Sequence, residues 1–187
     1  MILLQNTEQR YGAVALALHW LMAAVLVALL AMGVYMASLP DVGFDTRKIV
    51  LILYHKQLGL LALVLAALRL AWRVGSLLPS LVQTLPEWQK VTARFVHLSF
   101  YGLMFALPIT GWLMSSATGI PVSLFGLFDL PDLVPYSDRS FRALVATHKW
   151  LGYALIVCIA VHAGAALRHH FLLKDETLTK MWPQTRT

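Results

Sequence analysis

The chain has 187 residues, of which 59% are apolar and only 13% are charged. A soluble domain typically carries about a quarter charged residues, so this composition excludes an ordinary soluble protein and indicates an integral membrane protein. The formal net charge of +6 does not indicate a nucleic-acid-binding protein, because the basic residues flank apolar runs and form no single soluble basic face.

Four apolar runs are long enough to cross a hydrocarbon core, which takes about 20 residues of helix. They cover residues 14–37, 49–72, 95–114 and 141–167, without the alternation typical of barrel strands. The first run is too long for a cleavable signal peptide, and it contains His19. The sequence therefore predicts an all-α fold, an integral membrane four-helix bundle that forms one domain over residues 1–187.

The connections carry the expected breakers. Pro79 and Pro86 prevent the second helix from continuing. The segment 115–140 is moderately apolar but rich in glycine and proline, which predicts a structured surface loop with room for a short interfacial helix. The lone cysteine, Cys158, excludes an internal disulfide and a cysteine-based zinc or iron–sulfur site, and it is expected to be a small apolar filler.

Basic residues predict the orientation, because they accumulate on the cytoplasmic side. The side that holds the termini carries nine: Arg10, Arg69, Arg73, Lys90, Arg94, Arg168, Lys174, Lys180 and Arg186. The other side carries six: Arg47, Lys48, Lys56, Arg139, Arg142 and Lys149. The bias predicts a multi-pass protein with both termini in the cytoplasm.

Five histidines lie within the four spans, where ionisable residues are costly and usually functional. They are His19, His55, His97, His148 and His162. Because successive helices run in opposite directions, His19 and His97 are expected near the cytoplasmic face, and His55 and His148 near the outer face. A single such histidine could equally well make an inter-helix hydrogen bond, but here the depths pair up.

The fourth helix supplies a histidine at each depth. His162 follows His148 by 14 residues, which is roughly 21 Å along a helix and nearly four turns. Both imidazoles therefore share one face. The second helix offers a partner at the outer depth, and either His19 or His97 offers one at the inner depth.

Two pairs of histidines at two depths are what two b-type haems require, because a haem iron takes axial ligands from opposite sides. Gly59 and Gly152 follow His55 and His148 by one turn, which indicates clearance for a porphyrin, although small residues also help membrane helices pack. Zinc would need three or four ligands in one cluster. A proton relay would usually include an intramembrane acid, and none of the nine acids lies well inside a span.

Several motifs resemble the prokaryotic cytochrome b561 family, and specifically its short di-haem members, superoxide oxidase among them. They are "LHW" at 18–20, "HKQLGLL" at 55–61, "LRLAWR" at 68–73, "ALPITGW" at 106–112 and "HAGAALRHHFLLKDETLTKMWP" at 162–183. The resemblance implies a bacterial inner-membrane bundle with two haems b. It assigns His19 and His162 to the cytoplasmic-side haem iron, and His55 and His148 to the periplasmic-side one. Membrane cytochrome subunits of formate dehydrogenases and nickel–iron hydrogenases have a similar histidine arrangement.

The resemblance also implies a ubiquinone site at the cytoplasmic edge. His169 lies seven residues after His162 and corresponds to a histidine implicated there in superoxide oxidase. A water-accessible imidazole could relay protons to a quinone, although the "RHH" segment could instead bind lipid headgroups. His97 is left as a second possible quinone-side residue or as a packing residue.

The six basic residues of the outer side lie around His55 and His148 in the sequence, and Lys56 and Lys149 directly follow them. Such a rim, with Arg47 and Lys48 as further candidates, would attract a small anion such as superoxide. The alternative is ordinary interfacial anchoring. Five outer acids reduce the local net charge to about +1: Asp41, Asp45, Asp129, Asp132 and Asp138.

The expected function is therefore a superoxide:ubiquinone oxidoreductase, with superoxide or another redox donor and a quinone as partners, in contact with membrane lipid. An alternative is a cytochrome b electron-transfer subunit that couples a partner dehydrogenase or hydrogenase to the quinone pool. A haem sensor without redox function is a third reading. The short loops favour the self-contained enzyme.

Overall fold

The computed structural model describes residues 3–40, 45–80, 86–124 and 126–182. Asp41 and Arg186, which entered the charge counts above, lie outside these ranges. The helices are α1 (Ala13–Ser38), α2 (Thr46–Gly75), α3 (Glu87–Ala117) and α4 (Asp138–Arg168). Each is long and apolar enough to cross a membrane, and each contains one of the predicted runs. The prediction of an all-α membrane bundle is confirmed.

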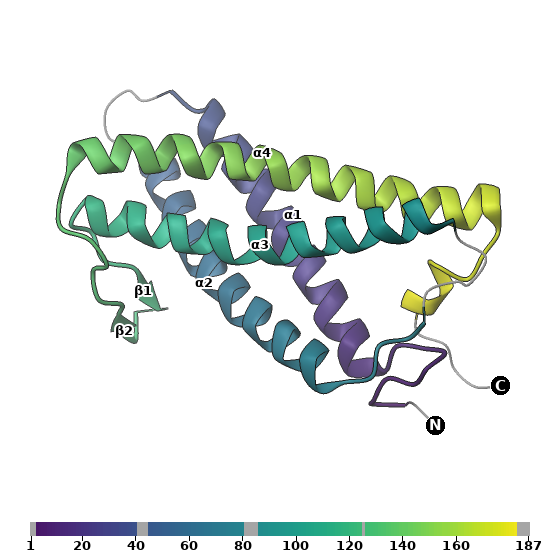
Figure 1. The fold of residues 1–187 in the computed structure, drawn as a ribbon. Helices are drawn as coiled ribbons and strands as arrows, with labels where there is room; N and C mark the ends of the chain where they lie inside the picture. The colour runs from purple at the N-terminus through teal and green to yellow at the C-terminus, as the bar shows by residue number, and fades with distance from the viewer. Residues whose placement is uncertain (1–2, 41–44, 81–85, 125, 183–187) are drawn as a thin grey trace.

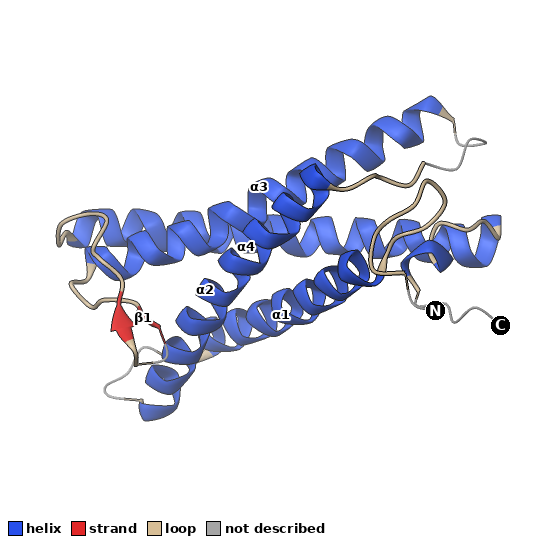
Figure 2. Ribbon diagram, turned by 90° about the horizontal axis from the view of Figure 1, so that it is seen from below, coloured by secondary structure: helices blue, strands red, loops and turns tan. Residues whose placement is uncertain are grey.

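The four helices do not pack equally against one another. α3 and α4 lie side by side along the molecule, and α1 and α2 cross them at a slant (Figure 1). The backbones of α1 and α2, of α2 and α3, and of α3 and α4 approach each other closely, whereas the backbone of α4 comes near that of α1 or α2 at few points and meets them mainly through side chains. Both termini lie at one end of the bundle, here called the termini end, and a short hairpin marks the opposite, hairpin end (Figures 1 and 2).

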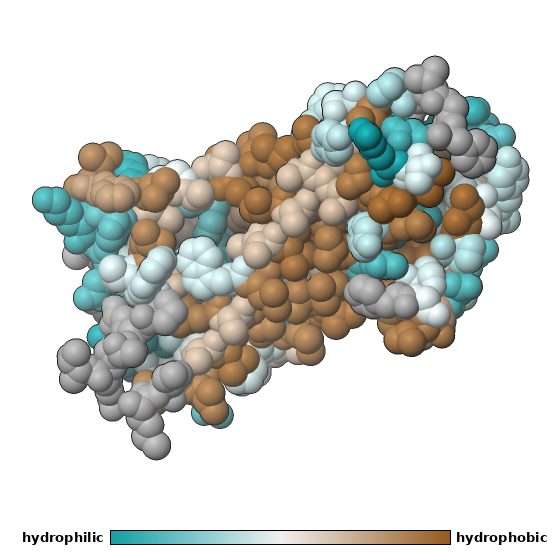
Figure 3. Space-filling view, turned by 180° about the vertical axis from the view of Figure 1, so that it is seen from behind, coloured by the Kyte–Doolittle hydropathy of each residue, from teal (hydrophilic) through white to brown (hydrophobic). Residues whose placement is uncertain are grey.

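One small apolar cluster forms the centre of the bundle. It consists of Met22, Val25 and Leu26 of α1, Ala62, Leu65 and Ala66 of α2, Met104 of α3 and Leu155 of α4. Ala62 and Ala66 lie one turn apart, and such small residues let membrane helices approach closely. Most other large apolar side chains are exposed, and on the face drawn in Figure 3 the surface between the two ends is predominantly hydrophobic. Such a surface suits contact with lipid.

The N-terminal segment is fastened to the termini end by Asn6. Its side chain donates to the Leu77 carbonyl at 2.8 Å and accepts from the Gly12 N–H at 2.8 Å. A Cβ atom at Gly12 would lie 2.4 Å from the backbone of Leu4 and Gln5, so only glycine fits this approach. The segment thereby connects the start of α1 to the end of α2.

The loop between α3 and α4 differs from the expectation of a short interfacial helix. Its described residues contain two antiparallel strands, β1 (Ser123–Leu124) and β2 (Phe128–Asp129). Gly119 and Gly126 adopt φ values of 69° and 75°, in the left-handed region that favours glycine. These glycines turn the chain where a helix would have to continue.

α4 extends further than the predicted residue 167. A π-helical turn, η1 (His169–Leu173), continues it and ends at Lys174, whose φ of 53° reverses the chain. A 3₁₀ turn, η2 (Thr179–Met181), follows. The Trp20 indole of α1 donates to the Met181 carbonyl at 2.9 Å, so the C-terminal segment returns to the start of α1.

Candidate functional site

The intramembrane histidines meet as two groups. At the hairpin end, the ring centres of His55 from α2 and His148 from α4 lie 6.1 Å apart. At the termini end, those of His19 from α1 and His162 from α4 lie 6.2 Å apart. His97 of α3 lies 5.7 Å from the same His162 ring. Ring distance alone therefore does not choose between His19 and His97 as the partner of His162.

Thr110 orients His148. The Thr110 hydroxyl lies 3.0 Å from Nδ1 of His148 and 2.9 Å from the Leu107 carbonyl. Its single proton is donated to that carbonyl, so the hydroxyl oxygen accepts from the ring Nδ1–H. This tautomer leaves a lone pair on Nε2 of His148, as a metal ligand requires. Spacing along the sequence does not reveal this partner, because it lies on a different helix.

Two glycines of neighbouring helices face the hairpin-end rings. A Cβ atom at Gly33 of α1 would lie 3.6 Å from Cε1 of His55, and one at Gly111 of α3 would lie 3.5 Å from Cε1 of His148. Nδ1 of His55 is buried without a hydrogen-bond partner in the described part of the chain. Sequence reasoning identified neither glycine, since each lies on a helix that carries no histidine of this pair.

In the termini-end group, Arg69 fixes the tautomer of His19. Its guanidinium donates to Nδ1 of His19 at 2.9 Å. Arginine can only donate, so in a neutral ring the proton of His19 lies on Nε2. The Phe100 ring packs edge-on against His162 with centres 5.3 Å apart. Arg69 belongs to the "LRLAWR" motif of α2, and its contact with His19 of α1 becomes visible only in the packing of these two helices.

Open space adjoins both groups. A Cβ atom at Gly59, Gly152 or Gly164 would meet nothing within 4 Å. α4 also stands apart from α1 and α2 although its histidines face theirs. Within residues 3–40, 45–80, 86–124 and 126–182, no group of three His, Cys, Asp or Glu side chains could hold a metal ion by itself. The arrangement favours a ligand that fills space between two imidazoles over a compact zinc site.

His169 lies apart from these groups. Its Nδ1 is 2.5 Å from a carboxylate oxygen of Asp175, beyond the π-helical turn. Burial raises the pKa of Asp175, but hydrogen bonds from Thr177 and His169 outweigh it and lower the pKa below its ordinary value. Asp175 is therefore an ionised acceptor at neutral pH. Asp175 was not predicted, although it falls within the most distinctive C-terminal motif.

The basic candidates at the hairpin end make separate contacts. The Lys56 ammonium donates to the Ser115 hydroxyl at 2.7 Å, and that of Lys149 lies 5.9 Å from the Tyr153 ring centre. Lys48 donates to the Leu39 carbonyl at 3.4 Å, and the Asp45 carboxylate caps α2 by accepting from the Arg47 backbone N–H at 2.9 Å. Lys56 and Lys149 thus flank the two histidines in sequence but contact different elements.

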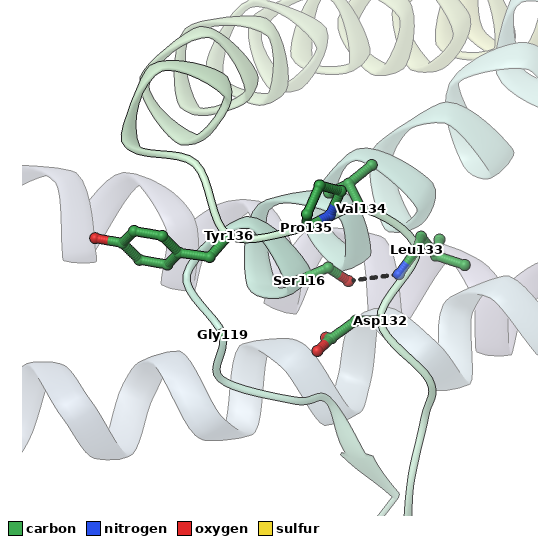
Figure 4. A pocket seen from close by; sticks show the side chains of 7 residues that line it. All are labelled: Ser116, Gly119, Asp132, Leu133, Val134, Pro135 and Tyr136. Atoms are coloured by element: carbon green, nitrogen blue, oxygen red, sulfur yellow. Dashed lines mark hydrogen bonds between the residues drawn. The ribbon is translucent and has the colours of Figure 1, made fainter.

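A cavity of about 430 Å³ also opens at the hairpin end (Figure 4). Residues 132–136 line it together with Ser116 and Gly119, and the Ser116 hydroxyl accepts from the Leu133 N–H at 3.1 Å. None of the intramembrane histidines lines this cavity. The candidate site is therefore the two histidine groups.

The sequence model of the prokaryotic cytochrome b561 family matches residues 10–184. The chain belongs to the prokaryotic cytochrome b561 family. It is 35% identical to cytochrome b561 homolog 2 of Escherichia coli (strain K12) over 94% of this chain and 93% of that protein. Cytochrome b561 homolog 1 of the same organism is 30% identical over 95% and 99%. The probable superoxide oxidase CybB of Yersinia pestis is 28% identical over 96% and 99%.

Membership makes this cytochrome b561 a multi-pass membrane protein that binds haem b and transfers electrons. The hairpin-end pair fits such a group. His55 and His148 would hold its iron between them, because their rings face each other from two helices with centres 6.1 Å apart and the Nδ1–H of His148 is already held by Thr110.

The termini-end group of this cytochrome b561 fits the ring separation but not the proton position. Iron binding through Nε2 of His19 requires the ring proton on Nδ1, where the Arg69 guanidinium now donates. His19 would hold a haem iron only in the other tautomer, in which its Nδ1 no longer accepts from Arg69.

Proposed function

We propose that this cytochrome b561 is a superoxide:ubiquinone oxidoreductase, a single di-haem domain of the bacterial inner membrane with both termini in the cytoplasm. The observation that carries the proposal is the meeting of His55 with His148 at one end of the bundle and of His19 and His97 with His162 at the other, where the family resemblance assigns His19 as the ligand. Haem b, when bound at these pairs, supplies a one-electron couple.

The overall reaction balances. Two superoxide anions each give up one electron and become dioxygen, and ubiquinone takes up the two electrons and two protons to become ubiquinol. One electron enters per superoxide at the periplasmic face, while the protons come from water on the cytoplasmic side. The protein must therefore attract an anion at the hairpin end and admit a quinone and protons at the termini end.

Side chains at both ends suit these tasks. At the hairpin end, Lys56 and Lys149 directly follow the two proposed ligands, and with Arg47 and Lys48 they give this end positive charges that would attract an anion. At the termini end, His169 keeps its Nδ1 on the Asp175 carboxylate, which leaves Nε2 for proton exchange. The similarity to the probable superoxide oxidase of Yersinia pestis supports this choice of substrate.

The proposal is tested on the purified protein. We expect two haems b per chain and haem reduction by enzymatically generated superoxide under conditions where a soluble ubiquinone is then converted to quinol. Superoxide can also reduce a quinone directly, so a protein-free sample and the His55→Ala variant serve as controls. If wild-type quinol formation does not exceed these controls, the superoxide reaction is wrong and the partner-subunit function replaces it.

A further inference from the structure

The loop between α3 and α4 folds back along the bundle. Two views place its hairpin of β1 and β2 nearer the middle of the molecule than the end of α3 (Figures 1 and 2). The Trp112 indole donates to the Pro131 carbonyl at 3.1 Å, and the Ser115 hydroxyl donates to the Ile120 carbonyl. Trp112 lies more than one turn before α3 ends at Ala117. The loop therefore returns toward the membrane-spanning part of α3.

The first limb of the loop lies at the level of His55. Lys56 directly follows His55 on α2, and its ammonium donates at 2.7 Å to the same Ser115 hydroxyl that donates to Ile120. β1, which comes next in the chain, lies against α2. The first limb is thus fastened beside a part of α2 that belongs to the predicted span 49–72.

The second limb lies at the level of His148. Trp112, which donates to Pro131, directly follows Gly111 on α3. A Cβ atom at Gly111 would lie 3.5 Å from Cε1 of His148. Both limbs are therefore held at the depth of the hairpin-end histidines.

Exposed aromatic side chains indicate that this depth is a membrane boundary. Tyr54 directly precedes His55 and is exposed. Trp150 and Tyr153 follow His148 on α4 and are exposed as well. Tryptophan and tyrosine are enriched where membrane proteins meet the headgroup region. The loop is therefore expected at the boundary between headgroups and acyl chains, not in the water beyond it.

The hairpin has one apolar and one polar face. Leu124 of β1 pairs with Phe128 of β2, and Ser123 pairs with Asp129. Because successive residues of a strand point to opposite faces, each of these pairs occupies one face. Phe128 is 57% exposed, and the neighbouring Leu127 is 80% exposed. Two adjacent large apolar side chains are thus left uncovered by the chain itself, with a carboxylate on the other face.

We infer that the hairpin is a lipid-binding element that inserts Leu127 and Phe128 among the phospholipids of the leaflet at the hairpin end and keeps Asp129 in the headgroup layer. Amphipathic helices in such a position bury their apolar face by about 5–10 Å. A water-soluble protein partner fits less well, because both limbs are tied down at the membrane boundary and do not project from it. The inference goes beyond the proposed function and does not depend on the electron donor or acceptor.

Adjacent residues on opposite faces of the hairpin allow a test by spin labelling. Cys158, the single cysteine of the chain, is first replaced by alanine. Leu127→Cys and Phe128→Cys then carry a nitroxide on the apolar side, Asp129→Cys is the matched control on the polar face, and Val157→Cys on the exposed face of α4 is the lipid-facing reference. The oxidised holoprotein is placed in phospholipid nanodiscs. Electron paramagnetic resonance measures how accessible each label is to oxygen, which partitions into lipid, and to a water-soluble nickel complex.

We expect the ratio of oxygen to nickel accessibility at positions 127 and 128 to exceed that at 129 about threefold or more and to approach that at 157, since the apolar face is buried in lipid. Equal ratios at 128 and 129 would place both faces in water and overturn the inference. Labels that neither reagent reaches, with spectra broadened by a neighbouring label, would identify a second copy of the chain as the occupant. That result would overturn the lipid assignment as well.

A measurement on the unmodified protein covers the case in which a cysteine variant does not fold. Phospholipids that carry a diazirine on the acyl chain are photoactivated around the holoprotein in nanodiscs, and the labelled residues are identified by mass spectrometry. Label on Leu127 or Phe128 supports the inference. Label on exposed side chains of the four helices, but on neither of these two residues, would overturn it.

Discussion

At the scale of single residues, the informative contacts are those that decide where a ring proton lies. Thr110 holds a proton on Nδ1 of His148, whereas Arg69 excludes one from Nδ1 of His19. The two proposed ligand sites therefore differ in the structure. His148 has the tautomer that a metal ligand needs, whereas His19 has the opposite one.

Thr110→Val should weaken haem binding at the hairpin end. The hydroxyl that accepts from His148 is lost while the side-chain volume is nearly kept, and loss of such a partner typically lowers metal affinity about 10- to 100-fold. Thr110→Ser should restore binding, because it keeps the hydroxyl. Haem dissociation monitored by transfer to apomyoglobin, together with the reduction potential of each haem, would measure this. Equal haem loss in both variants would indicate a packing role for Thr110 instead.

Replacement of His19 and of His97 should have different effects on haem content. We expect His19→Ala to leave one haem per chain, as should His162→Ala, whereas His97→Ala should retain two. The reason is that the family resemblance assigns His19 as the ligand and leaves His97, whose ring lies 5.7 Å from that of His162, as a possible quinone-side residue. A pyridine haemochrome assay on purified variants gives the count. If His97→Ala retains one haem and His19→Ala retains two, His97 rather than His19 is the partner of His162.

At the scale of elements, helix ends and returning segments hold the termini end together. The N-terminal segment joins α1 to the end of α2 through Asn6, and the C-terminal segment joins α4 to α1 through Trp20. Because α4 packs little against α1 directly, these links supply contacts that the helices themselves do not make.

Gly12→Ala should detach the N-terminal segment. A Cβ atom there lies 2.4 Å from backbone atoms of Leu4 and Gln5, so the segment must move and the Asn6 hydrogen bonds break. The cost should be about 1–3 kcal/mol, as for other losses of buried hydrogen bonds. Limited proteolysis in detergent should cut before α1 faster than in wild type. Gly75→Ala, where a Cβ meets open space, is the control and should leave the cleavage rate unchanged.

At the scale of the whole molecule, the apolar cluster separates the two histidine groups. Leu155, which is only 1% exposed, lies seven residues from both His148 and His162. It is the one buried residue of α4. The bundle is therefore packed at its middle and open near both ends, where the histidines meet and space is left beside them.

Leu155→Ala should lower the stability of the whole bundle and should not affect one histidine group more than the other. The lost packing should cost of the order of 2 kcal/mol or more, measured by denaturation in detergent. Val157→Ala, on the exposed face of the same helix, should change stability little. Leu155 lies about two turns from each proposed ligand, so both haems should be retained in the folded fraction. Selective loss of one haem would contradict this central role.

The sequence alone determined the four spans, the depth of each histidine and the shared face of His148 and His162, because hydropathy and helical period are properties of a single helix. Only the tertiary structure decided which side chains surround those rings. Thr110, Arg69, Gly33 and Gly111 come from other helices, and spacing within one helix carries no information about how a neighbour is rotated against it.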